Sequence, residues 1–170
     1  MTERTKTLTW HDPMIGAKAM TTMSGIDYMR ALQAGDFPPP PILAVMNLDL
    51  LEVGEGTVTF TAQPDESHYN PIGAVHGGFA CTVLDSVTGC AVQTTLPQGF
   101  GYTSLEIKVN YLAGITATTG PLTAVGTVIK PGKRVAFAEG VLTDSSGKVV
   151  ATASSTLLVF PIPGVTPIPE

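Results

Sequence analysis

One carboxylate stands alone in a long stretch of chain that carries no other charge. Asp85 is the only Asp, Glu, Lys or Arg between Ser67 and Leu105, and it falls midway along a segment that is apolar nearly all round. Burial disfavours a charged carboxylate unless it has a hydrogen-bonding partner. Asp85 therefore either faces a solvent gap and bonds neighbouring hydroxyls, or acts as a general base or nucleophile. Composition alone leaves both interpretations open.

A glycine-rich segment precedes Asp85 and leads into the same helix. It contains Asn70 and the triplet His76-Gly77-Gly78. Free backbone N–H groups at a helix N-terminus carry partial positive charge and bind anions or polarise carbonyl oxygens. Glycine also lets a substrate approach the backbone closely. An ordinary glycine-rich helix start has the same sequence, so His-Gly-Gly by itself is a weak signal.

Gly77 and Asp85 are too far apart to serve one carbonyl group from a single helix. They are eight residues apart, which corresponds to about 12 Å of helical rise. An oxyanion donor and a base or nucleophile must both lie within about 3 Å of the reacting atoms. Two antiparallel helices in a dimer place the start of one beside the middle of the other. If both residues are catalytic, the spacing predicts a site shared between subunits.

The elements that must position these residues predict an α+β fold. A short helix is expected over 25–34, a β-hairpin over 48–62, and one long helix from Gly77 to about Leu96. Consecutive strands joined by short turns form an antiparallel sheet. A curved antiparallel sheet wrapped around one long central helix is the hotdog arrangement, and we predict that fold. The strands after the long helix are expected at 102–111, 122–129, 134–142 and 149–160.

A single hotdog domain is expected to span residues 42–160. Residues 1–41 are expected to form an N-terminal arm with the short helix, and residues 1–24 show no sustained periodicity. Residues 161–170 carry four prolines and are expected to form a loose C-terminal tail.

Composition limits the possible partners. The chain of 170 residues is 44% apolar and 14% charged, with a net charge of −5. Such an apolar chain is expected to bury further surface in a homodimer or homotetramer. The acidic balance argues against nucleic acid, which requires clustered Lys and Arg.

No apolar segment has the character of a signal peptide or a membrane span, so we expect a cytoplasmic protein with no membrane partner. Cys81 and Cys90 lie nine residues apart in the expected long helix. That separation places them on opposite faces, too far apart for a disulfide, so both are expected to be reduced thiols.

The chain from Asn70 to Leu112, NPIGAVHGGFACTVLDSVTGCAVQTTLPQGFGYTSLEIKVNYL, resembles the PaaI-like (phenylacetate-degradation type) family of hotdog-fold acyl-CoA thioesterases. The similarity extends more loosely from Ser24 to Val159. Its specific feature is the combined spacing, with Asn six residues before His-Gly-Gly and Asp eight residues after the first Gly.

The resemblance implies hydrolysis of an acyl-CoA to a free acid and CoA, without metal or redox cofactor. The Gly77 N–H would polarise the thioester carbonyl, and Asn70 would position that carbonyl or the water. Asp85 of the opposite subunit would act as general base or nucleophile. The apolar surroundings of the long helix indicate a medium-chain or aromatic acyl group.

The resemblance also implies that four residues contact the substrate or the carboxylate. Ser104 would carry a hydroxyl near the carboxylate, and Thr88, one turn beyond Asp85, would hydrogen-bond it. Gly78 belongs to the same helix start, and His76 would bond the loop that holds Asn70.

A basic cluster is a candidate site for the phosphates of coenzyme A. Three of the chain's nine Lys and Arg residues lie within five positions, at Lys130, Lys133 and Arg134. Lys or Arg at a tight turn suits phosphate. A solvated hairpin tip would have the same composition, so this alternative stays open.

Two other functions must be weighed against a thioesterase. A non-catalytic acyl-CoA-binding module would keep the glycine-rich helix start but would not need Asp85. A hotdog hydratase or dehydratase pairs a catalytic His with a carboxylate, and no local Asp-x4-His spacing is present, since Pro71 stands five positions before His76. Cys81, one turn before Asp85, is set aside as a nucleophile because buried helix cysteines are inert.

Overall fold

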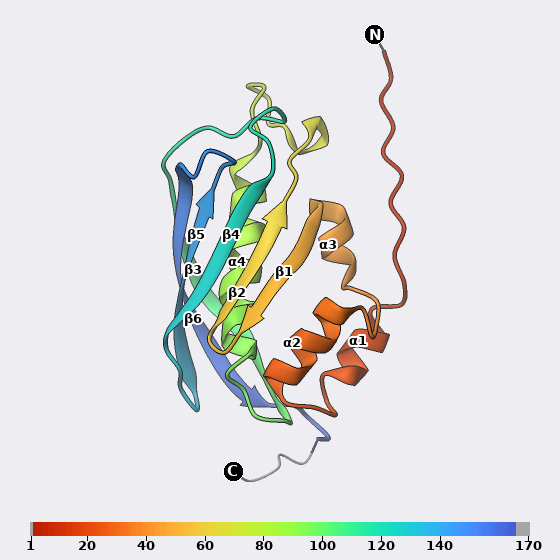
Figure 1. Cartoon of the computed structure of the whole chain (residues 1–170), viewed down its shortest axis with the longest axis vertical. Coiled ribbons are helices and arrows are strands. Elements are labelled where there is room, and N and C mark those ends of the chain that lie inside the picture. Colours follow the sequence, from red (N-terminus) through yellow and green to blue (C-terminus); the bar gives the residue numbers. More distant parts are fainter. Residues whose placement is uncertain (1, 166–170) are drawn as a thin grey trace.

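A single six-stranded antiparallel sheet curves around one long helix (Figure 1). The computed structural model describes residues 2–165. The elements in chain order are α1 (Met14–Ala19), α2 (Gly25–Ala34), α3 (Pro41–Met46), β1 (Leu48–Gly54), β2 (Thr57–Ala62), the 3₁₀ turn η1 (Glu66–His68), α4 (Gly77–Gln93), β3 (Phe100–Tyr111), β4 (Leu122–Lys130), β5 (Val135–Thr143) and β6 (Val149–Pro161). The strand order in the sheet is β1-β2-β4-β5-β6-β3. The predicted hotdog fold is confirmed.

The core lies between the concave face of the sheet and α4. Strand β2 alternates as its sequence predicts, with Val58, Phe60 and Ala62 buried and the intervening threonines facing outward. Val83 and Val87 of α4 have no exposed surface, so that helix is enclosed rather than amphipathic. The long helix predicted from Gly77 is confirmed, although it ends at Gln93.

Helix α4 approaches the sheet closely because a glycine faces it. A Cβ atom added at Gly126 of β4 would lie 2.1 Å from the carbonyl oxygen of Val87. Both partners in this contact belong to the main chain, one in a central strand and one in the buried helix. Neither can shift without disturbing its close-packed surroundings. The glycine therefore sets the spacing between helix and sheet.

We expect Gly126→Ala to lower the free energy of unfolding by about 1–3 kcal/mol, because the added methyl group overpacks this contact. Gly114→Ala is the matched control, since a Cβ atom there meets nothing within 4 Å and its φ is not positive. Denaturation by guanidinium chloride measures both variants. Equal midpoints for the two variants would contradict the role assigned to Gly126.

The N-terminal region differs from the expected arm. Residues Met14–Ala19 form α1, and α2 begins and ends as predicted, with Ser24 accepting the Asp27 N–H and Gly35 left-handed at φ +80°. Met29 of α2 is 1% exposed and belongs to the same core as α4. The helices before the first strand are therefore part of the packed domain.

The predicted domain boundaries shift at both ends. The boundary expected between residues 41 and 42 falls inside α3, which begins at Pro41. Pro161 is the last residue of β6 instead of the first residue of the tail. Of the expected tail, residues 166–170 lie outside the part of the chain that the structure describes.

The two edges of the sheet are covered differently. Helices α2 and α3 pack on the β1 side, whereas no described element pairs with the outer edge of β3. Leu105 on β3 is 57% exposed, and Tyr111 and Leu112 at its end are exposed to a similar extent.

No helix within residues 2–165 has both the length and the apolar character needed to cross a membrane.

Candidate active site

Asp85 and Ser104 come together from α4 and β3. The Ser104 hydroxyl donates a 2.7 Å hydrogen bond to Oδ1 of Asp85, and both side chains are half-buried. The pairing of β3 with β6 shifts by one residue between Ser104 and Glu106, and such a bulge re-aims the side chains around it. The predicted neighbourhood of Ser104 and the carboxylate is therefore present, and Asp85 is a partly buried carboxylate held in one orientation.

His76 caps the N-terminus of α4. Its Nδ1 accepts the Gly78 backbone N–H at 2.8 Å, and its carbonyl oxygen accepts the Phe79 N–H. The side chain thus holds the helix start, and the link to the preceding loop is made by the His76 backbone N–H, which bonds the carbonyl of His68. The Gly78 N–H is thus occupied by His76, and close approach of a substrate to the Gly78 backbone stays a prediction.

The Gly77 N–H is the free donor of this helix start. Among residues 2–165 it has no hydrogen-bond acceptor. The Tyr111 ring lies over Gly77, with its hydroxyl donating to the Gly77 carbonyl oxygen at 3.1 Å. A Cβ atom at Gly77 would lie 3.1 Å from that ring, so glycine keeps the contact open. Tyr111 was not among the residues expected at the site, since its only signal was an aromatic residue at the end of a strand.

Asn70 folds the loop that leads to α4. Its Oδ1 accepts the backbone N–H groups of Ile72 and Ala74, both at 3.1 Å. This arrangement uses the side-chain oxygen within the loop and leaves the side-chain nitrogen as the group that can reach a ligand. Asn70 lies at the same end of α4 as Gly77.

The prediction for Thr88 is wrong. The Thr88 hydroxyl donates to the backbone carbonyls of Leu84 and Asp85, at 2.9 and 3.1 Å, and not to the Asp85 carboxylate. Its side chain is fully buried and its methyl group packs against Gly140 of β5. A buried threonine inside a helix satisfies its hydroxyl with the carbonyl four residues earlier, so Thr88 faces the sheet and cannot contact substrate.

The basic cluster lies at the far end of the molecule from Gly77. Lys130, Lys133 and Arg134 are exposed around the turn between β4 and β5. Next to this turn the Val128 N–H bonds Gly56, whose own N–H bonds Thr94 at the C-terminal end of α4. Within one chain the structure does not bring these cations to the helix start, and their contact with CoA phosphates stays a prediction.

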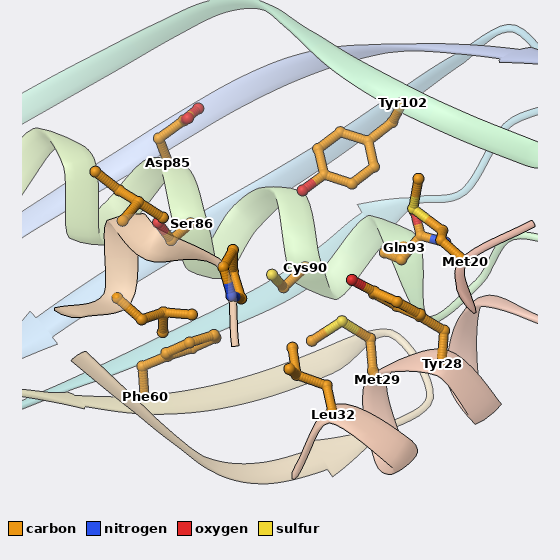
Figure 2. A pocket seen from close by; sticks show the side chains of 13 residues that line it. Met20, Tyr28, Met29, Leu32, Phe60, Asp85, Ser86, Cys90, Gln93 and Tyr102 are labelled. Atoms are coloured by element: carbon orange, nitrogen blue, oxygen red, sulfur yellow. The ribbon is translucent and has the colours of Figure 1, made fainter. Parts of the chain in front are cut away.

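A cavity of about 260 Å³ opens beside Asp85 (Figure 2). One wall comes from the N-terminal helices and their connections, with Met20, Met29 and Leu43 among its side chains, and another comes from α4. The lining is mainly apolar, and Asp85 is the only charged residue that the described part of the chain contributes to it. The N-terminal helices were not expected at the site, because nothing local in the sequence marks which distant segment covers a helix.

The two cysteines of α4 are thiols and not thiolates at neutral pH. Both are free. Burial, together with the nearby Asp85 charge, raises the pKa of Cys81. Burial raises the pKa of Cys90 to about 12. Neither thiol is therefore activated as a nucleophile.

Comparison with known proteins identifies the family. The model of the thioesterase superfamily matches residues 72–151, which include both Gly77 and Asp85. A Caenorhabditis elegans protein that carries an esterase name is 30% identical over 118 residues, covering 68% of this chain and 69% of that protein. This chain belongs to the thioesterase superfamily. The family assignment makes it a thioester hydrolase.

Other thioesterase relatives agree. Human acyl-coenzyme A thioesterase 13 is 29% identical over 111 residues, which cover 64% of this chain and 77% of that protein. A phenylacetic acid degradation-related protein of Ralstonia eutropha JMP134 superimposes with a TM-score of 0.71 at 27% identity, covering 77% of this chain and 98% of that one.

Two further solved structures are similar to this chain, one with a bound ligand and one that shares the fold. A Streptococcus mutans UA159 protein bound to acetyl CoA superimposes with a TM-score of 0.63 at 25% identity, covering 68% of this thioesterase and 90% of that chain. The PaaI protein of Escherichia coli shares the fold, with a TM-score of 0.70 at 18% identity over 85% of this chain and 99% of that one. The PaaI-like resemblance of residues 70–112 is confirmed.

Proposed function

We propose that this thioesterase hydrolyses acyl-CoA to a free acid and CoA, with Asp85 as general base or nucleophile. The observation that carries the proposal is the half-buried Asp85 carboxylate, held by Ser104 at the edge of an apolar cavity. The name of human acyl-coenzyme A thioesterase 13 and the acetyl CoA in the Streptococcus mutans structure support CoA thioesters as the substrate class.

The active site is formed by two subunits. Gly77 and Asp85 lie on one helix, eight residues apart, so about 12 Å of rise separates them. The uncovered edge of β3, with its exposed Leu105, Tyr111 and Leu112, offers the surface along which a second copy can pair. We therefore propose a homodimer, alone or within a homotetramer, in which each Asp85 faces the partner subunit's Gly77.

The reaction then needs only groups of the protein and water. As a general base, Asp85 takes a proton from water while the water oxygen attacks the thioester carbonyl. The N–H of the partner subunit's Gly77 holds the resulting oxyanion. Collapse breaks the C–S bond, and the proton passes to the CoA sulfur. As a nucleophile, Asp85 would instead displace CoA first and form an anhydride that water hydrolyses.

The remaining predicted contacts take secondary parts in this proposal. The Asn70 side-chain nitrogen positions the carbonyl or the water, and Ser104 orients the Asp85 carboxylate. Lys130, Lys133 and Arg134 hold CoA phosphates by their charge. No metal or redox cofactor is required, since Asp85 supplies the base or nucleophile and Gly77 the oxyanion donor.

The acyl group is proposed to be medium-chain or aromatic. The cavity is apolar over most of its surface and measures about 260 Å³. That is slightly below the roughly 300–1,000 Å³ of sites that enclose drug-sized ligands. An acyl group fits such a volume, whereas the CoA moiety must lie outside it.

Release of free CoA thiol from short, medium, long and aromatic acyl-CoAs tests the function. We expect turnover of medium-chain or aromatic members of the panel. Binding of the panel without hydrolysis would instead favour the non-catalytic acyl-CoA-binding module. Hydration of an enoyl-CoA without thiol release would favour the hydratase.

Ser104→Ala is expected to lower kcat by about tenfold to 100-fold, because a hydrogen bond to a charged group contributes about 1.5–3 kcal/mol and its loss frees the carboxylate to rotate. KM should change little, since Ser104 acts through Asp85. Ser154→Ala on the exposed face of β6 is the control and should keep the wild-type kcat. An unchanged kcat in Ser104→Ala would contradict the role of Ser104 in orienting Asp85.

A further inference from the structure

One polar side chain in the cavity lacks a hydrogen-bond partner. Gln93 is 3% exposed, and its Oε1 is fully buried with no donor within reach among residues 2–165. The side chain lines the cavity at the C-terminal end of α4. Buried polar atoms in folded proteins are almost always paired, so an unpaired one on a residue that lines a cavity favours a partner supplied by a ligand.

The hydrogen-bonding groups of the Gln93 amide indicate which chemical group of a ligand can pair with it. A glutamine amide presents one acceptor oxygen and one donor nitrogen, whereas a hydroxyl both donates and accepts. A hydroxyl therefore matches whichever amide atom faces the cavity. The neighbouring Tyr28 and Tyr102 hydroxyls stay neutral, because burial raises the pKa of both. Among residues 2–165 no Lys or Arg lines the cavity, so a carboxylate at the same place would be buried without a cation from them.

The position of Gln93 determines which part of the acyl group it meets. Figure 2 shows Asp85 toward one end of the cavity, Cys90 in the middle and Gln93 beyond it along α4. Eight residues separate Asp85 from Gln93, which is about 12 Å of helical rise. With the thioester carbonyl at Asp85, the atoms near Gln93 belong to the remote end of the acyl group.

This separation is longer than a single aromatic ring with one methylene group spans. The lining also includes Met29 and Leu32, whose flexible side chains adapt to a flexible chain. The cavity is therefore shaped for a straight chain whose far end carries the polar group.

We propose that Gln93 is a specificity-determining residue that selects straight medium-chain acyl-CoAs with a hydroxyl at the remote end of the chain. The inference rests on the proposed thioesterase function and adds to it the acyl class. Removing the matching hydroxyl from a substrate leaves the buried amide unpaired, which is the basis of strong discrimination by a polar site.

The test compares kcat/KM for octanoyl-CoA and 8-hydroxyoctanoyl-CoA, and for decanoyl-CoA and 10-hydroxydecanoyl-CoA. We expect the wild type to prefer the hydroxylated member of at least one pair by about tenfold or more. Gln93→Met keeps the length of the side chain and removes the amide, so it is expected to abolish or invert the preference. Gln63→Met, at an exposed position after β2, should keep it.

The outcomes separate this inference from the proposed function. Hydrolysis of octanoyl-CoA that depends on Asp85, with no preference for either hydroxylated chain, overturns the role of Gln93 and leaves the thioesterase standing. An unchanged preference in Gln93→Met also overturns it. No hydrolysis of any acyl-CoA overturns the proposed function, and this inference with it. If Gln93→Met does not fold, the wild-type preference decides alone.

Discussion

Asp85→Asn is expected to lower kcat for acyl-CoA hydrolysis by about 100-fold or more, with little change in KM. Asparagine has nearly the same shape, and its side-chain oxygen can still accept the hydrogen bond from Ser104. It can neither take a proton from water nor attack the carbonyl, so both proposed roles are lost. Release of CoA thiol at saturating substrate measures the effect.

The control for Asp85→Asn is a carboxylate outside the site. Glu139→Gln changes an exposed residue of β5 and should keep the full rate. Size-exclusion chromatography and thermal unfolding establish that both variants fold and assemble alike. A full rate in Asp85→Asn would place the chemistry elsewhere in the protein.

Repeated turnover in ¹⁸O-labelled water distinguishes the two roles of Asp85. If Asp85 is the nucleophile and water attacks the aspartyl carbon of the anhydride, mass spectrometry finds the label in the peptide that contains Asp85. If it is a general base, the label appears only in the free acid.

Gly77→Pro is expected to lower kcat by about 100-fold to 1,000-fold, the usual effect of removing one oxyanion donor. Proline lacks the backbone N–H but suits the first position of a helix. His76 already has the extended conformation that a residue before proline requires, with φ −61° and ψ 137°.

Gly77→Ala is the matched control for Gly77→Pro. It places a Cβ atom against the same Tyr111 ring, 3.1 Å away, while it keeps the N–H. A small effect in Gly77→Ala and a large one in Gly77→Pro therefore isolates the contribution of the donor. Equal losses in the two variants would assign the effect to the contact with Tyr111.

Mixing the two inactive variants tests whether the site is shared. In a dimer of one Asp85→Asn subunit and one Gly77→Pro subunit, one of the two sites combines an intact Asp85 with an intact Gly77. Random co-assembly in a two-fold dimer should therefore restore about a quarter of the wild-type rate. No recovery in mixtures shown to contain mixed dimers would contradict the shared site.

Local patterns in the sequence were sufficient for the fold and for the central residue. The period-two alternation of residues 57–62 predicted a strand, because one face of it had to be buried. Ser24 and Gly35 marked both ends of α2, since helix caps depend on neighbouring residues only. Asp85 was recognisable from the sequence because a lone carboxylate in an apolar helix is costly to bury without a hydrogen-bonding partner, whichever elements pack against that helix.

Contacts between distant segments were decided by the tertiary structure. The cavity wall formed by α2, α3 and Met20, the Tyr111 ring over Gly77 and the unpaired amide oxygen of Gln93 all depend on which surfaces meet when the chain packs. Sequence spacing states which side of a helix a residue occupies, but not what covers that side.

The position of Thr88 shows the same limit within a single helix. It lies one turn beyond Asp85, and the family resemblance implied a hydrogen bond to the carboxylate. Packing turned that side of α4 toward Gly140, and the Thr88 hydroxyl donates to backbone carbonyls of the preceding turn. The sequence thus determined the elements and the place of the lone carboxylate Asp85, whereas the rotation of α4 against the sheet decided which of its side chains reach the cavity.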